Sequence, residues 1–162
     1  MDQQEFIARY AGIYEHSQWV AERVAPIAAE LTDTARVADL MADCVDNADT
    51  ETQLALIRAH PDLADKAQVA GELTAESTEE QASAGLDRCS KVDYERFQAL
   101  NDAYKEKFGF PFVMAVRDSS CSEVLAEFSA RLRNDYNLEF ETALAEIHKI
   151  ARLRLRALEA RA

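Results

Sequence analysis

Basic side chains are in short supply in this sequence. Lys and Arg number 18 against 30 Asp and Glu, which leaves a formal net charge of −12 at pH 7. A surface of this charge repels phosphate backbones and anionic membrane surfaces, so we expect neither nucleic acid nor a membrane as a partner. The basic residues near the C-terminus have no aromatic residues among them, and we interpret them as a solvated helix face favoured by the helix dipole: Lys149, Arg152, Arg154, Arg156 and Arg161.

Long apolar runs and paired cysteines are also missing. Charged residues interrupt the first 20 positions, so they do not read as a signal peptide, and no later stretch approaches the length of a membrane span. The last residues do not form a peroxisomal address. Cys44, Cys89 and Cys121 lack the Cys-x-x-Cys spacing of a zinc or redox site. This cysteine usage suits a reducing compartment, and we expect a cytoplasmic protein.

The remaining composition is that of an ordinary folded domain. The chain has 162 residues, of which 48% are hydrophobic and 30% charged. A chain of this length can bury most of the surface that its unfolded form exposes. Since it contains no internal repeat, low-complexity tract or linker, we expect residues 1–162 to form one domain around one core.

Apolar residues recur at spacings of three and four along most of the chain, which predicts helices. The first begins at a capping box of Asp2 and Glu5 and carries apolar residues from Phe6 to Tyr14. A second contains Pro26, which marks a kink or a break. Gly109 is expected to end a later helix. Counting the second, the other helices are expected at about 17–31, 37–45, 50–59, 77–86, 93–108, 122–133 and 138–160, and residues 63–70 could form a short additional helix.

One apolar segment has no helical period. The run Phe110–Val116 contains proline and is too apolar for a surface loop, so we interpret it as a buried extended segment. No two segments alternate with the period of paired strands. The predicted fold is therefore an all-α bundle of about seven to eight helices with one short extended apolar segment.

Histidine is the first candidate for chemistry. His16 and His148 stand in charged helical stretches, where a solvent-facing side chain is the simpler interpretation. His60 precedes Pro61, which ends the helix before it, and a titratable imidazole in that position suits general acid–base catalysis. The helix dipole explains a histidine there equally well. A metal site is less expected, because no His-x-x-His, Glu-x-x-His or cysteine partner stands nearby.

Three further features have two interpretations each. Ser77 and Glu80 form a capping box, and with Gln81 they also place polar groups at a helix N-terminus that favours an anionic ligand. The 112–116 segment is either core or a backbone that hydrogen-bonds a planar ligand rich in carbonyl and N–H groups. Arg131 or Arg133 either clamps a carboxylate or forms a surface ion pair with Glu127 or Asp135.

A series of motifs occurs in order along the chain. They are His60-Pro61-Asp62-Leu63-Ala64, Leu73-Thr74, Ser77-x-x-Glu80-Gln81, Ala84-Gly85-Leu86, Phe97-x-x-Leu100-Asn101-x-x-Tyr104, Lys107-Phe108-Gly109-Phe110-Pro111-Phe112-Val113 and Phe128-x-x-Arg131-Leu132-x-Asn134. From Phe6 to Leu155 the sequence resembles the OHCU decarboxylases, which decarboxylate 2-oxo-4-hydroxy-4-carboxy-5-ureidoimidazoline (OHCU) in urate breakdown. The joint occurrence of these motifs in this order is far more specific than any one of them alone.

The resemblance implies an all-helical enzyme that needs no cofactor, is usually a homodimer, and converts its anionic small-molecule substrate to (S)-allantoin and carbon dioxide. It implies His60 and Glu80 as the catalytic pair. The residues that it implies in contact with substrate are Pro61, Ser77, Thr78, Glu79, Glu80, Gln81, Phe112, Val113, Met114, Ala115, Val116 and Arg131.

Two positions depart from the pattern of the family. Asp65 stands where relatives often have glycine, and Ala130 stands where they often have a second arginine, which leaves Arg131 and Arg133 as alternatives for the substrate clamp. Two other functions remain open on the residues alone. One is a helical interaction module with a docking groove at Phe110–Val116, and the other is an enzyme of the same fold for a different ureide or keto acid.

Overall fold

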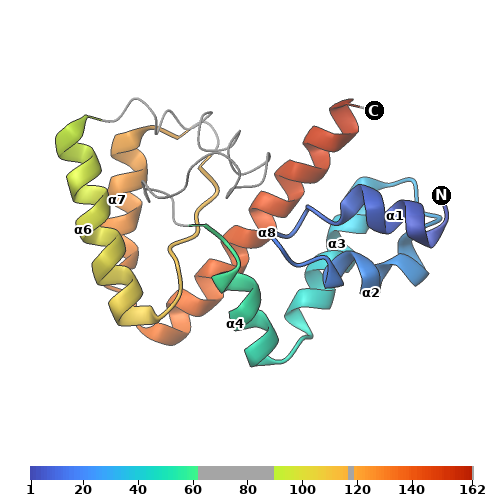
Figure 1. The fold of residues 1–162 in the computed structure, drawn as a ribbon, viewed down its shortest axis with the longest axis horizontal. Coiled ribbons are helices and arrows are strands. Elements are labelled where there is room, and N and C mark those ends of the chain that lie inside the picture. Colours follow the sequence, from blue (N-terminus) through green and yellow to red (C-terminus); the bar gives the residue numbers. More distant parts are fainter. Residues whose placement is uncertain (62–89, 117–118, 162) are drawn as a thin grey trace. The chain divides into compact units, whose positions relative to one another are not determined.

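The protein is helical throughout the residues that its structure, a computed structural model, describes: 1–61, 90–116 and 119–161. These residues form seven helices and no strand, which confirms the all-α prediction (Figure 1). Within the same ranges, none of the helices is both long enough and apolar enough to cross a membrane. The helices are α1 (Gln3–Tyr10), α2 (Trp19–Ala28), α3 (Thr34–Asp46), α4 (Thr50–Arg58), α6 (Lys91–Phe108), α7 (Cys121–Arg131) and α8 (Tyr136–Arg161).

The chain divides into two compact units. The first comprises Met1–Ala59 and Ile147–Ala162, and the second comprises His60–Glu146. Helix α8 runs through the boundary between Glu146 and Ile147 and so contributes to both units. The expectation of one domain over residues 1–162 stays a prediction.

Short polar side chains begin three helices of the first unit, α1, α3 and α4. Asp2 and Glu5 form the predicted capping box, in which each side chain accepts a hydrogen bond of 2.8 Å from the backbone N–H of the other. Asp33 caps α3, and Asp49 caps α4. Pro26 lies inside α2, where it neither ends nor interrupts the helix. Local signals thus account for where these helices start.

Helix α1 ends at Tyr10, four residues before the predicted end at Tyr14. A buried ion pair of the first unit lies beyond this end: Arg154 of α8 lies 2.8 Å from Glu15, and the two residues are 3% and 0% exposed. Arg154 also donates to the carbonyl oxygens of Gly12 and Ile13, at 3.2 and 3.3 Å. Both carbonyls lie beyond Ala11, the C-cap of α1, and the arginine supplies hydrogen-bond donors for them outside the helix. The interpretation of Arg154 as part of a solvated face is wrong.

His16 and His148 differ from each other. His16 is exposed, as predicted, and takes a left-handed backbone with φ of 49°. His148 is not solvent-facing, because its Nδ1 lies 2.9 Å from the Tyr14 hydroxyl and its Nε2 lies 2.9 Å from Asp46. That prediction is wrong, since α8 packs this face into the first unit.

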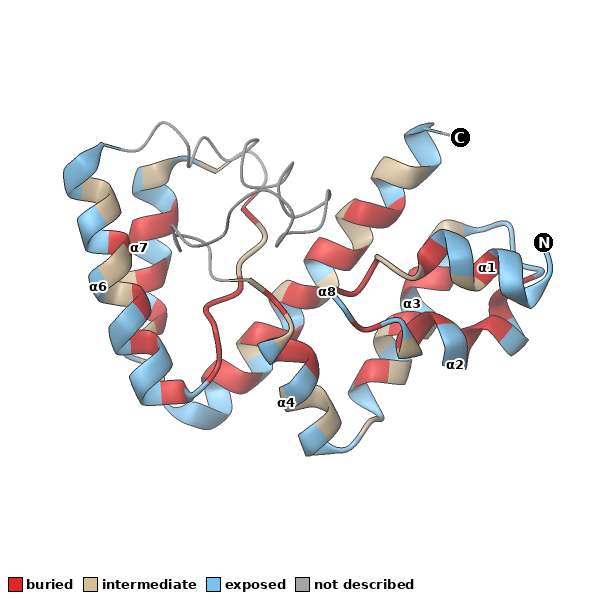
Figure 2. Ribbon diagram, viewed as in Figure 1, coloured by how far each residue is buried: buried red, intermediate tan, exposed pale blue. Residues whose placement is uncertain are grey.

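An aromatic cluster forms the core of the second unit. The Tyr104 ring of α6 lies 4.6 to 5.9 Å from four phenylalanine rings, and two of these, Phe112 and Phe128, stack on each other at 3.9 Å. Gly109 ends α6 in the left-handed region with φ of 73°, as predicted, and turns the chain into the segment that follows. Figure 2 shows that segment largely buried beside α6, α7 and α8.

The described cysteines have different states. Cys44 in α3 is a free thiol, and burial raises its pKa. Cys121 at the start of α7 is disulfide-bonded, a pairing that the wide spacing of the cysteines does not indicate.

Candidate functional site

His60 stands where the sequence predicts, at the end of a helix. Helix α4 ends at Arg58, Ala59 is its C-cap, and His60 and Pro61 continue the chain outside the helix. The histidine is only 7% exposed, whereas Pro61 is half-buried. A buried imidazole next to a proline is held in a restricted orientation, which general acid–base catalysis requires.

Several predicted site residues lie outside the described residues. They are Ser77, Thr78, Glu79, Glu80 and Gln81, together with Asp62, Asp65 and the helices expected at 63–70 and 77–86. The pairing of His60 with Glu80 therefore stays a prediction. Among the residues that the structure does describe, no group of three His, Cys, Asp or Glu side chains could hold a metal ion.

The predicted apolar segment is buried and belongs to neither a helix nor a strand. Phe112, Val113 and Val116 are buried, while Met114 and Ala115 are half-buried. The Phe112 ring stacks on Phe128 of α7, which anchors the start of the segment. Since the backbone here lies outside regular structure, each N–H and C=O must find a partner elsewhere.

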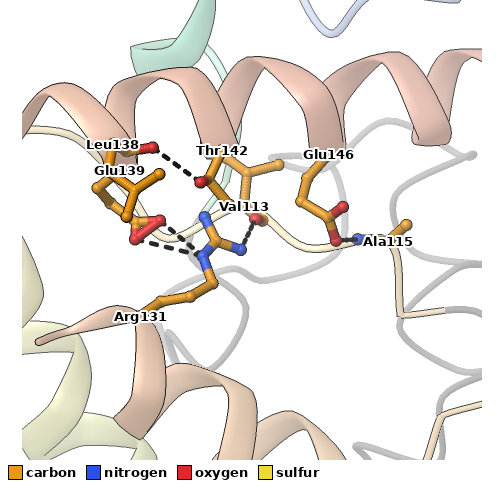
Figure 3. A network of polar contacts seen from close by, with 7 residues as sticks. All are labelled: Val113, Ala115, Arg131, Leu138, Glu139, Thr142 and Glu146. Atoms are coloured by element: carbon orange, nitrogen blue, oxygen red, sulfur yellow. Dashed lines mark hydrogen bonds and ion pairs between the residues drawn. The ribbon is translucent and has the colours of Figure 1, made fainter. Parts of the chain in front are cut away.

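Partners for three backbone groups of this segment come from the second unit itself (Figure 3). The Val113 carbonyl accepts a hydrogen bond of 2.6 Å from Nη1 of Arg131. The Ala115 N–H donates to Oε1 of Glu146 at 3.3 Å. The Val116 carbonyl accepts from the N–H of Ser119 at 3.0 Å. The backbone N–H and C=O of Met114 make no hydrogen bond with the described residues.

Arg131, the last residue of α7, has a buried partner that the sequence analysis did not identify. Its Nε lies 2.7 Å from Oε1 and 3.3 Å from Oε2 of Glu139 in α8. The two side chains are 3% and 0% exposed, so the interpretation as a surface ion pair with Glu127 or Asp135 is wrong. The guanidinium carbon also lies 4.3 Å from the centre of the Phe112 ring. Arg133, the alternative clamp, is exposed.

A protein-family comparison bears on this site. The family model described as OHCU decarboxylase matches residues 1–156, a span that contains every residue of the site. The chain belongs to the OHCU decarboxylase family. The resemblance that the ordered motifs indicate is therefore confirmed.

Individual relatives agree with this membership. The chain is 44% identical to the 2-oxo-4-hydroxy-4-carboxy-5-ureidoimidazoline decarboxylase of Haloferax volcanii, over 96% of this chain and 89% of that protein. It is 43% identical to the protein of the same name from Halalkalicoccus jeotgali, over 97% and 86%. The crystal structure of an (S)-allantoin synthase superposes with a TM-score of 0.78 at 32% identity, and covers 98% of this chain but 51% of its own.

Arg131 acts on the pKa values of two buried acidic groups, Glu139 and Tyr104. Burial raises the pKa of Glu139, and the charge of Arg131 opposes that rise. Burial likewise raises the pKa of the Tyr104 hydroxyl, and Arg131 again acts against it. The Tyr104 hydroxyl and Nη2 of Arg131 have no hydrogen-bond partner in the described part of the chain. The arginine thus supplies the positive charge of an otherwise acidic and aromatic interior.

Glu139 and Glu146 are the residues that sequence reasoning missed. Both continue the apolar face of α8, since Glu139, Ala143, Glu146 and Ile150 follow one another at spacings of three and four. Ala143 and Ile150 on that face are buried. A carboxylate on a buried helix face needs a buried partner, so the pattern itself is the signal that could have found them.

Proposed function

We propose that this chain is a carboxy-lyase that converts OHCU to (S)-allantoin and carbon dioxide in urate breakdown. The observation that supports it most is family membership over 1–156 together with 44% identity to a named OHCU decarboxylase. The buried His60 beside Pro61 fits the histidine that the family resemblance implies for catalysis.

The chemistry fits an enzyme without a cofactor. When the bond between the ring and the carboxylate breaks, its electron pair moves into the conjugated C=N system of the ring, and carbon dioxide leaves. The nitrogen of that C=N group takes up a proton, and a second proton is delivered to one face of the ring carbon beside it, while the hydroxyl group loses its proton as a carbonyl forms. The substrate thus supplies its own electron sink, which is the role that a cofactor has in other decarboxylases.

The tasks left to the protein are orientation and proton transfer. We assign the proton transfers to His60 and Glu80 as a coupled pair: one engages the hydroxyl and carboxylate of the substrate, and the other manages the proton that reaches the ring. Burial of His60 supports this, because a site shielded from water limits protonation of the ring by solvent. Pro61, the stretch 77–81 and the 112–116 backbone hold the ring and ureido groups.

The proposed homodimer rests on the family resemblance, and the proposed location is the expectation from the amino-acid sequence. We propose a homodimer in the cytoplasm. Light scattering at micromolar concentration tests the first, with twice the mass of 18.1 kDa as the expected result. A mass of one chain would contradict it.

The experiment that tests the catalytic assignment compares two histidine variants. His60→Gln keeps the size of the side chain and removes its titration, and we expect turnover to fall about 100-fold or more, the range of general acid–base catalysis. His16→Gln is the matched control, because His16 is exposed, and its turnover should equal that of the wild type. Substrate is generated in situ from urate, and far-UV circular dichroism checks the fold. Near-normal turnover by folded His60→Gln would refute the role of His60.

A further inference from the structure

Side chains bind the backbone of the 112–116 segment at two alternate residues, Val113 and Ala115. The Val113 carbonyl and the Ala115 N–H are both bound, at 2.6 and 3.3 Å, by side chains of α7 and α8. Successive residues of a chain outside a helix direct their backbone groups to alternate sides when the chain is extended. We therefore expect the backbone groups of Met114, between them, on the side opposite to the two bound groups. This agrees with their lack of a hydrogen bond to any described residue.

Arg131 of α7 and Glu146 of α8 hold the two bound positions. Arg131 is fixed by three contacts, with Glu139, with the Val113 carbonyl and over the Phe112 ring. Its planar guanidinium makes each contact in a defined direction, which a lysine could not do. Glu146 lies two turns along α8 from Glu139, on the same helix face. Two positions on one face of α8 therefore hold the segment in place, Glu139 through Arg131 and Glu146 directly (Figure 3).

We propose that Arg131 and Glu146 are positioning residues, which hold the Val113 carbonyl and the Ala115 N–H so that the Met114 N–H and C=O are presented to the ring of the substrate. The inference rests on the proposed function and deepens it. It also assigns Arg131 a role through the backbone, in place of direct contact with the substrate carboxylate. A planar ring with N–H and carbonyl groups is recognised by such a donor and acceptor pair.

Glu146 offers the sharper test, because its contact uses one carboxylate oxygen. Glu146→Leu removes the acceptor, and we expect KM for OHCU to rise about fivefold to tenfold with kcat changed less than about threefold, since one orienting hydrogen bond is lost. Glu146→Gln keeps an oxygen acceptor and should restore KM to within about twofold of the wild type. Glu141→Leu is the matched control on the same helix, because Glu141 is exposed, and should leave KM unchanged.

Hydrogen exchange of the backbone gives a readout that does not depend on activity. A peptide that spans residues 110–116 should exchange faster in Glu146→Leu than in wild type and in Glu146→Gln. Should Glu146→Leu fail to fold, Glu146→Asp withdraws the carboxylate while keeping its charge, and should show the same changes in milder form. Arg131→Lys should raise both exchange and KM.

The outcomes separate the two proposals. If wild-type protein does not decarboxylate OHCU, the proposed function fails, while the exchange data still test the contacts. Equal KM in Glu146→Leu and wild type, equal damage by Gln and Leu, or unchanged exchange in Glu146→Leu would each overturn the positioning role. If Arg131→Lys raises KM but leaves hydrogen exchange unchanged, Arg131 contacts the substrate directly and does not act through the backbone.

Discussion

Removal of one arginine should weaken the first unit severely. Arg154 lies 2.8 Å from Glu15 and also donates to the Gly12 and Ile13 carbonyls. Arg154→Met keeps most of the apolar volume but leaves a carboxylate at 0% exposure without its arginine. Breaking a buried ion pair from one side costs about 3 to 5 kcal/mol, and the two carbonyls add to the loss.

The magnitude converts into a measurable shift. For a chain of this size, 1 kcal/mol moves the thermal midpoint by about 2 to 4 °C, so we expect Arg154→Met to lower the midpoint by about 6 to 20 °C. The single tryptophan, Trp19, lies in α2 of the same unit. Its fluorescence during urea unfolding therefore reports on the first unit directly.

Two further variants complete the assay. Arg156→Met is the control, since Arg156 is exposed one position beyond Leu155, and should change the free energy of unfolding by less than about 0.5 kcal/mol. Glu15→Leu combined with Arg154→Met removes both charges and should recover much of the stability. A loss below about 1 kcal/mol in Arg154→Met, or a double variant weaker than Arg154→Met, would refute the reasoning.

Two other positions test local features. Gly109→Ala should lower the free energy of unfolding by about 1 kcal/mol in urea titrations, because its φ of 73° disfavours a Cβ; a change near zero would contradict the left-handed turn. Hydrogen bonds from Thr52 lower the pKa of the Asp49 carboxyl, so its stabilising effect is present above about pH 4 and is lost as pH falls through the lowered value. The stability of wild type relative to Asp49→Asn should therefore shrink between pH 5 and 2, with Asp102→Asn as the exposed control; a difference that is constant with pH would contradict it.

Local signals made most of the fold predictable. The capping box at Asp2, the stop at Gly109 and the buried run at Phe110–Val116 each depend on residues within a few positions of one another. Apolar periodicity predicted the helices for the same reason, because the residues on one face of a helix lie only three and four positions apart in the sequence. Ordered motifs were also enough to identify the family.

The errors arose where distant residues decide the structure. The spacing places Tyr14 in the first helix, but α1 ends at Tyr10, and Arg154, 140 positions from Tyr14, donates to the two carbonyls that precede it. Arg131 had two acidic neighbours in sequence, yet its partner is Glu139, because α7 and α8 bring them together inside the second unit. A charged residue shows its need for a partner, but its sequence neighbours do not identify which residue the fold brings to it.

The most direct test of the account is the circular dichroism of allantoin formed when urate oxidase and hydroxyisourate hydrolase generate OHCU in solution. Addition of this protein should produce a rapid signal of (S)-allantoin, and the His60→Ala variant should not. If only the slow racemic background appears with folded wild-type protein, the chain does not catalyse this decarboxylation.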